Sequence, residues 1–301
     1  MTRPFHKPAT TYEQQVELLQ ARGMEINDPA KAAFFLKQIN YYRLCAYWLP
    51  FEQKHATHLF KPGTEFDDVL RAYFADRRLR LLFLDAIERI EVSVRCHWAY
   101  EMAHQHGPHG YLDSGLAKRT DFWKANIEKL QTEVDRSDET FIEHIKNTYS
   151  EPLPPVWAAA EVMSLGLLSS WYDNLKPTAT RTAIANSYHI DESVLSSWLH
   201  HLTVVRNICA HHSRLWNRKF VLTPQRPRTK PAGLGPQFIP GSRKIYNTIL
   251  LTLHLMGQVA PNSKWKRRLL AHLRSGELNL KGMDFPNNWQ TYPIWNVGEM
   301  Q

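Results

Sequence analysis

The sequence predicts an all-α protein, and three observations support this prediction. Apolar residues recur at three- and four-residue spacing along most of the 301 residues. The run 67–100 contains neither glycine nor proline. No segment shows the strict alternation of apolar and polar residues that a half-buried strand requires. With 43% hydrophobic and 12% aromatic residues, the chain has the composition of a folded protein.

The N-terminal part is expected to hold two helices, 11–20 and 29–48, separated by Gly23 and by the helix start at Asn27-Asp28-Pro29. Apolar side chains surround the second helix broadly, so much of it should be buried, and Pro50 ends it. The run 67–100 should then form one long helix. Its apolar stripe faces the core, while its charged residues, Arg80 and Glu91 among them, lie on the opposite face.

The rest of the chain shows the same periodicity, interrupted by Gly- and Pro-rich loops. Asp191 is the expected N-cap of the helix that leads into residues 206–211. The chain as a whole is expected to divide into three segments. These are an N-terminal helical segment 1–60 that packs on the core, a helical domain 61–275 with a basic part 206–274, and a tail 276–301. Helices are expected at 122–134, 141–149, 156–165, 167–175, 191–211, 242–256 and 263–274, and loops at 104–115, 224–240 and from 278 onward.

The positive charge is concentrated in one part of the chain. The net charge is +8, yet residues 1–205 hold 22 Lys and Arg against 26 Asp and Glu. Residues 206–274 hold 14 Lys and Arg and no acidic residue. A solvated helix face normally mixes both signs, so this segment indicates contact with a phosphate backbone.

The N-terminus lacks the apolar segment of a secretory signal, and the longest apolar run, 249–256, is too short to span a bilayer. We therefore expect a cytoplasmic protein that does not enter a membrane. The three cysteines, Cys45, Cys96 and Cys209, are expected to be reduced and buried.

The start of the basic segment carries side chains suited to phosphodiester chemistry. Asn207 and His211 are four residues apart and share a helix face, Arg206 must reach round to join them, and Arg214 would follow one turn later. Imidazole exchanges protons near neutral pH, and arginine stabilises charge on phosphate. This set suits RNA cleavage without a metal or cofactor, in which the 2′-hydroxyl attacks the phosphate. His212, or His211 of a second protomer, would supply the second proton-transfer group.

These residues are also compatible with two other interpretations. Arg206 and His211 are also compatible with an ordinary polar helix end, with Arg206 paired to an acid such as Glu88 or Glu91. Zinc is the second alternative, because histidines and a cysteine are close in sequence, but their spacing does not match the usual zinc fingers. The residues considered for zinc are His200, His201, Cys209, His211 and His212.

The sequence from Arg206 to Asn217, RNICAHHSRLWN, resembles the Abi-like family of abortive-infection proteins, of the AbiD/AbiF type, within the HEPN superfamily of RNases. The Arg206-Asn207-Ile208-Cys209-Ala210-His211 string fits the HEPN motif, and further likeness runs from about residue 31 to 256. It includes Ile39-Asn40-Tyr41-Tyr42-Arg43-Leu44, Ala86-Ile87-Glu88-Arg89-Ile90-Glu91 and Pro155-Val156-Trp157.

The resemblance implies a HEPN-like helical bundle with additional N- and C-terminal helices. It also implies a homodimer with two Arg/His motifs in one cleft, and an antiviral RNase toxin, with some relatives controlled by a small noncoding RNA. The alternative function is a non-catalytic RNA-binding or scaffold protein of a ribonucleoprotein. A DNA-binding regulator is disfavoured because no helix-turn-helix pattern is present.

Other residues are assigned supporting roles. Glu88 and Glu91 would orient the motif, and Tyr42 and Arg43 would stack on unpaired bases, although core packing is the more common role for such aromatics. The expected RNA contacts are Arg214, Arg218, Lys219, Arg226, Arg228, Lys230, Arg243, Lys244, Lys264, Lys266, Arg267 and Arg268.

Overall fold

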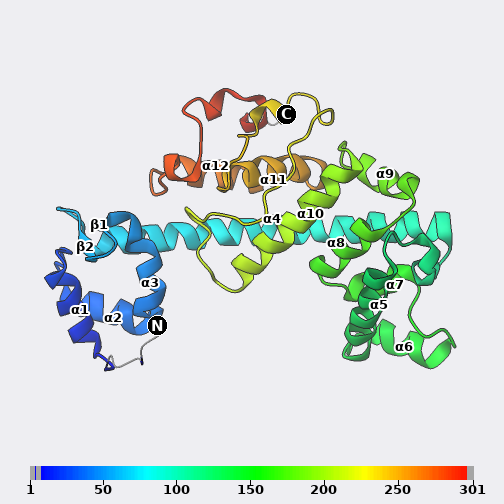
Figure 1. Cartoon of the computed structure of the whole chain (residues 1–301), viewed down its shortest axis with the longest axis horizontal. Coiled ribbons are helices and arrows are strands. Elements are labelled where there is room, and N and C mark those ends of the chain that lie inside the picture. The colour runs from blue at the N-terminus through cyan, green and yellow to red at the C-terminus, as the bar shows by residue number, and fades with distance from the viewer. Residues whose placement is uncertain (1–3, 5–7, 297–301) are drawn as a thin grey trace. The chain divides into compact units, whose positions relative to one another are not determined.

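The computed structural model describes residue 4 and residues 8–296, and the fold in this part of the chain is all-α (Figure 1). Two compact units are distinguished. Unit 1 comprises Met1–Leu79 and His272–Leu278, and unit 2 comprises Arg80–Ala271 and Asn279–Gln301. The expected long helix is confirmed as α4, Phe66–His106, whose first turns belong to unit 1 and whose remainder belongs to unit 2.

Unit 1 begins with three helices, α1 (Tyr12–Ala21), α2 (Pro29–Ile39) and α3 (Tyr41–Trp48). The single helix expected at 29–48 is therefore wrong. Asn40 interrupts it with a φ of 73°, and its side-chain oxygen accepts the backbone N–H of Tyr42 at 2.9 Å, capping α3. Asparagine tolerates positive φ and bonds to nearby backbone, which explains the break at this residue.

A short antiparallel hairpin follows the 3₁₀ turn Leu49–Phe51 (η1). It pairs β1 (Glu52–Lys54) with β2 (Leu59–Phe60), and the register shifts between Glu52 and Lys54. The expectation of no strand is wrong here. A hairpin this short cannot display the period-two pattern by which a strand is recognised in a sequence.

Unit 2 packs the remaining helices around α4, with α8 (Leu165–Asn174) against both α10 (Glu192–Ala210) and α5 (Thr120–Asp135). A helix that the sequence did not suggest, α9 (Thr178–Asn186), precedes α10; its threonine-rich sequence has little apolar periodicity. The other elements of this unit are η2 (Gly110–Leu112), η3 (Ser114–Leu116), α6 (Thr140–Thr148), α7 (Val156–Val162), η4 (Gly235–Gln237), α11 (Tyr246–Val259), α12 (Trp265–Arg274), η5 (Lys281–Met283), η6 (Trp289–Thr291) and η7 (Pro293–Trp295). The last residues of α12 belong to unit 1.

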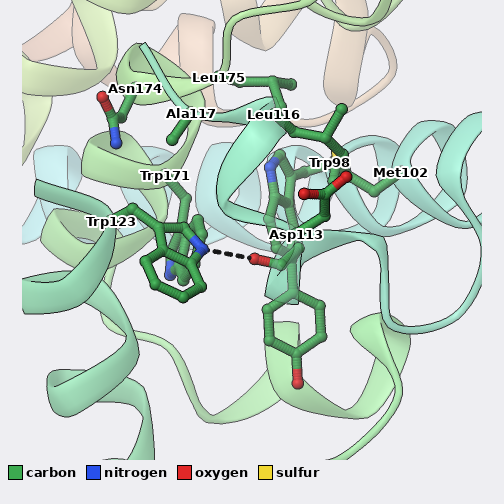
Figure 2. A pocket seen from close by; sticks show the side chains of 10 residues that line it. Trp98, Met102, Asp113, Leu116, Ala117, Trp123, Trp171, Asn174 and Leu175 are labelled. Carbon is green, nitrogen blue, oxygen red and sulfur yellow. Dashed lines mark hydrogen bonds between the residues drawn. The ribbon is translucent and has the colours of Figure 1, made fainter. Parts of the chain in front are cut away.

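The core of unit 2 is rich in tryptophan. A small pocket beside Trp98, Trp123 and Trp171 is lined mostly by apolar and aromatic side chains, with Asp113 and Asn174 as its polar residues (Figure 2). The indole N–H of Trp123 donates to the Tyr111 carbonyl at 3.0 Å. The pocket has room for about one water molecule. It therefore contributes to packing and is too small for a nucleotide.

Buried aromatic side chains anchor the C-terminal tail. Phe285, Trp289 and Trp295 are buried, and Trp295 stacks on Tyr246 of α11 with ring centroids 6.0 Å apart. No helix in the described part of the chain is both long and apolar enough to cross a membrane.

Candidate functional site

The motif lies at the C-terminal end of α10, which ends at Ala210. The expected continuation of the helix through residue 211 and on to Arg214 is therefore wrong, and Arg214 lies in the following loop. His211 is the C-cap, and His212 follows with a φ of 55°. The backbone N–H of His212 donates to the Cys209 carbonyl at 3.1 Å, and that of Ser213 to the Ile208 carbonyl at 2.9 Å. This is a Schellman motif in which His212 occupies the left-handed position that usually holds glycine.

Exposure differs along the motif in a way that suits a reactive site. Asn207, His211 and His212 are exposed and Arg206 is half-buried, whereas Ile208 and Cys209 face the core. Asn207 Oδ1 accepts a hydrogen bond from Arg206 Nη1 at 3.3 Å. Asn207 and His211 are therefore both solvent-exposed at the end of the helix.

The loop after α10 is held by Arg80, which the sequence placed on the exposed face of α4. The structure contradicts that placement, because Arg80 is only 5% exposed. Its Nη1 donates to the His212 carbonyl at 2.8 Å and to the Ser213 carbonyl at 3.3 Å. Both carbonyls belong to the loop beyond the C-cap of α10, and charge-assisted bonds from a buried guanidinium fix this loop to α4.

Glu91 is also buried rather than exposed, at 9%. It pairs with Arg95, which in addition donates to the Met163 carbonyl at 2.7 Å. Burial raises the pKa of Glu91, while the guanidinium groups of Arg95 and Arg206 oppose this effect. Glu91 is thus an electrostatic neighbour of Arg206, whereas Glu88 is exposed one turn earlier, and a role of either acid in orienting the motif stays a prediction.

Part of the predicted basic surface lies beside the motif loop. The Phe220 N–H donates to the Arg243 carbonyl at 2.7 Å, and Arg243 Nε donates to the Phe220 carbonyl at 2.7 Å. These two bonds hold segment 214–220 next to segment 243–244. We call the resulting group the proximal basic cluster; it consists of Arg214, Arg218, Lys219, Arg243 and Lys244.

Several cations of the proximal basic cluster also bind the backbone. Lys244 Nζ donates to the Asn217 carbonyl at 2.9 Å and to the Asn217 side-chain oxygen. Burial lowers the pKa of Lys244; Asp284 opposes this, and the positive charges of Lys219 and Arg214 add to it. The charges of Lys219 and Arg214 therefore act on Lys244 within the proximal basic cluster.

A second basic group lies toward the other end of α10. The indole N–H of Trp198 donates to the Gln225 carbonyl at 2.9 Å, and Thr229 donates to Asp191 Oδ2 at 2.7 Å. These contacts place Arg226, Arg228 and Lys230 beside the first half of the helix. At 1.5 Å per residue, Trp198 and His211 are about 20 Å apart, so one nucleotide cannot touch both groups. Asp191, the expected N-cap, makes no capping bond with its side chain.

The third basic group is on α12. Trp265 anchors this helix, since its indole N–H donates to the Leu82 carbonyl at 2.6 Å, and Arg268 pairs with Asp85 at 3.4 Å. Lys266 Nζ donates to the Asn296 carbonyl at 2.5 Å. Lys264 and Arg267 are exposed. Some predicted RNA contacts on this helix therefore also have structural partners.

Two of the remaining predictions concern α3 and His201. Tyr42 and Arg43 belong to α3 of unit 1, and Tyr42 is 74% exposed, so the expectation of core packing is wrong for this tyrosine. His201 is buried at 1%, and its Nδ1 donates to the Leu222 carbonyl at 2.9 Å while Nε2 accepts from Thr248 at 2.8 Å. Both ring nitrogens are used in the core, which argues against His201 as a zinc ligand.

The expectation of buried cysteines is confirmed for Cys209 but wrong for Cys96, which is exposed, and Cys45 is only half-buried. Arg80 is the residue that sequence reasoning missed. The sequence signal for its burial is its position in the long helix, where Arg80 directly follows Leu79 and precedes further apolar residues of the core stripe.

Comparison with known proteins supports the resemblance seen in the sequence. A family model described as Abi-like protein matches residues 34–217, from α2 through the motif loop. The matched segment contains Arg206, His211 and the anchoring Arg80. Neither curated proteins nor solved structures gave a significant match.

Proposed function

Since the chain belongs to the Abi-like family of abortive-infection proteins, which indicates a role in antiviral defence, we propose that it is a metal-independent endoribonuclease of the HEPN type. The observation that carries this proposal is the end of α10. There an exposed imidazole and amide stand beside a half-buried arginine, and the loop that follows adds the proximal basic cluster.

The proposed reaction is an intramolecular transfer. A base removes the proton from the 2′-hydroxyl, the 2′-oxygen attacks the adjacent phosphorus, and an acid protonates the departing 5′-oxygen. The products are a 2′,3′-cyclic phosphate and a 5′-hydroxyl. His211 acts as one proton-transfer group, and His212 or His211 of a second protomer acts as the other. Arg206 stabilises the charge that develops on the phosphate.

The charge of the protein supports this assignment of roles. A helix C-terminus carries partial negative charge, which repels phosphate. The end of α10 therefore needs cations to hold an anion, and Arg206 together with the proximal basic cluster supplies them. Asn207, whose Oδ1 accepts from Arg206, has its amide N–H groups available to a phosphate oxygen.

We further propose that the active form is a homodimer and that a small noncoding RNA bound along the basic segment controls it. Two symmetric copies would bring a second His211 to the site and so solve the need for both an acid and a base. The three basic groups, spread over more than one nucleotide length, suit an extended RNA.

The decisive experiment compares cleavage of labelled RNA by the wild-type chain with Arg206→Ala and His211→Ala. The matched control is His200→Ala, another exposed histidine of α10. We expect both motif variants to lose cleavage and growth arrest, the control to keep them, and the products to carry cyclic-phosphate ends. RNA with a single 2′-deoxy nucleotide at the cleavage site should resist the enzyme, and EDTA should have no effect.

A different outcome would favour the alternative function. If the wild-type, Arg206→Ala and His211→Ala proteins all bind RNA of one defined size and none of them cuts it, the chain is a non-catalytic RNA-binding component of a ribonucleoprotein. Cleavage that survives both substitutions would show that the site lies elsewhere.

A further inference from the structure

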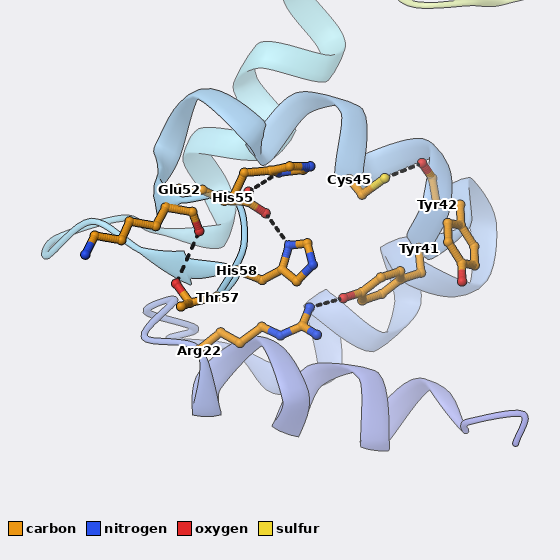
Figure 3. A network of polar contacts seen from close by, with 9 residues as sticks. Arg22, Tyr41, Tyr42, Cys45, Glu52, His55, Thr57 and His58 are labelled. Atoms are coloured by element: carbon orange, nitrogen blue, oxygen red, sulfur yellow. Dashed lines mark hydrogen bonds and ion pairs between the residues drawn. The ribbon is translucent and has the colours of Figure 1, made fainter. Parts of the chain in front are cut away.

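The hairpin of unit 1 brings together three side chains with metal-binding atoms. Glu52 begins β1, and His55 and His58 lie in the turn before β2. Nδ1 of His55 is 2.9 Å from Glu52 Oε2, and Nδ1 of His58 is 3.2 Å from Glu52 Oε1. Figure 3 shows both imidazoles turned toward the same carboxylate. The three ligand atoms all lie within 4.8 Å of one another.

The turn between β1 and β2 places both imidazoles. His55 and His58 lie in this turn rather than in a strand, and the register of the hairpin shifts between Glu52 and Lys54. His58 has a φ of 55°, in the left-handed region, where non-glycine residues are uncommon and often mark functional sites. The turn therefore holds both histidines beside the Glu52 carboxylate.

The charge of Glu52 indicates what is bound there. The Glu52 side chain is only 3% exposed, and among the described residues its ion-pair partners are the two histidines, with no lysine or arginine. Imidazole is ordinarily mostly neutral at physiological pH. A buried carboxylate needs a compensating positive charge, and a divalent cation placed between the three ligands would provide it.

We propose that Glu52, His55 and His58 form a zinc site. Imidazole nitrogen and carboxylate oxygen are preferred zinc ligands, with bonds of about 2.0–2.2 Å. Tetrahedral geometry then requires ligand atoms roughly 3.4 Å apart. Each histidine lies near this distance from one of the two Glu52 oxygens, and one set of three ligand atoms lies within 4.8 Å. Each neutral imidazole ligates through Nδ1 when its single proton resides on Nε2, so binding changes the tautomer and releases no net proton. Three protein ligands leave one position for water, on the side where His55 is 76% exposed.

This site shares no residue with the proposed cleavage site, so zinc binding and EDTA-insensitive RNA cleavage are compatible. Either one can fail without affecting the other.

The test uses the full chain without an affinity tag, stripped of metal and then titrated with Zn²⁺ alone. We expect one equivalent to bind per chain. His55→Ala and His58→Ala should each weaken zinc binding by about tenfold or more, because even the loss of a group that only hydrogen-bonds to a metal ligand typically weakens binding by this factor. His104→Ala is the matched control, because His104 is exposed and its Nδ1 bonds to the Tyr100 carbonyl of its own helix. Co²⁺ in place of Zn²⁺ should give the visible absorption of a tetrahedral site, lost in His55→Ala.

Because His55 is largely exposed, His55→Ala should fold normally, and circular dichroism will verify this. The proposal is overturned if the wild-type chain takes up no zinc beyond what the double variant His55→Ala/His58→Ala takes up, or if His55→Ala binds as tightly as wild type.

Discussion

Replacing Arg80 with methionine should loosen the loop that presents the motif. Arg80 is 5% exposed and donates to the His212 carbonyl at 2.8 Å and the Ser213 carbonyl at 3.3 Å. A hydrogen bond to a charged group contributes about 1.5–3 kcal/mol net. The longer bond contributes less, so we expect the free energy of unfolding to fall by about 2–4 kcal/mol. Methionine fills similar space with a flexible apolar chain, which limits the cavity left behind.

Urea unfolding of the full chain, followed by far-ultraviolet circular dichroism, measures this loss. If the two units unfold in separate transitions, the change should be confined to the transition of unit 2. Arg89→Met is the matched control, because Arg89 is exposed on the part of α4 that belongs to unit 2. Loss of its surface ion pair with Asp85 should change stability by only about 0.5 kcal/mol or less. RNA cleavage should drop in Arg80→Met and persist in the control. A loss for Arg80→Met no larger than that of the control would refute the anchoring role.

Three further predictions follow from the same region. His212→Gly should raise the free energy of unfolding by about 0.5–1 kcal/mol, because glycine adopts positive φ without steric cost. If the urea midpoint instead shows a decrease of the same size, the histidine side chain stabilises the loop. Burial lowers the pKa of His201 to about 4, so the folded state disfavours its protonated form. The contribution of neutral His201 to the free energy of unfolding should therefore be fully present above about pH 6.5, and up to ~3 kcal/mol of it should be lost as the pH drops toward 4. In urea titrations at several pH values, His201→Gln should flatten this pH dependence. Arg214→Ala should weaken binding of unrelated single-stranded RNAs by similar factors and reduce the slope of log affinity against log salt by about 1; a sequence-selective loss in filter binding would contradict a phosphate contact.

The helices of this chain were largely predictable because helical periodicity is a local property. The long run 67–100 is predictable as one helix, because it lacks glycine and proline and its apolar residues recur every three or four positions. Errors arose where a single residue or a short segment overrides this pattern. Asn40 breaks a helix by bonding to its own neighbourhood, and α9 has too few apolar residues to be noticed.

The candidate site was predictable in part. Arg206 through His211 could be located by motif, and the change from mixed charge to purely basic charge marks the same place in the sequence. The end of the helix was not predictable, because a histidine rather than a glycine occupies the left-handed position of the Schellman motif. The predicted RNA contacts are one continuous segment in sequence but three separate groups in the structure.

The sequence by itself determined the all-α class, the position of the motif and the concentration of positive charge, because these depend on local periodicity and on composition. Tertiary structure decided which charged groups are buried and which chain segments meet. Only packing brings Arg80 to the carbonyls after α10, Glu91 near Arg206, and segment 214–220 beside 243–244. These contacts join residues far apart in sequence, and their formation depends on how the helices close around a common core.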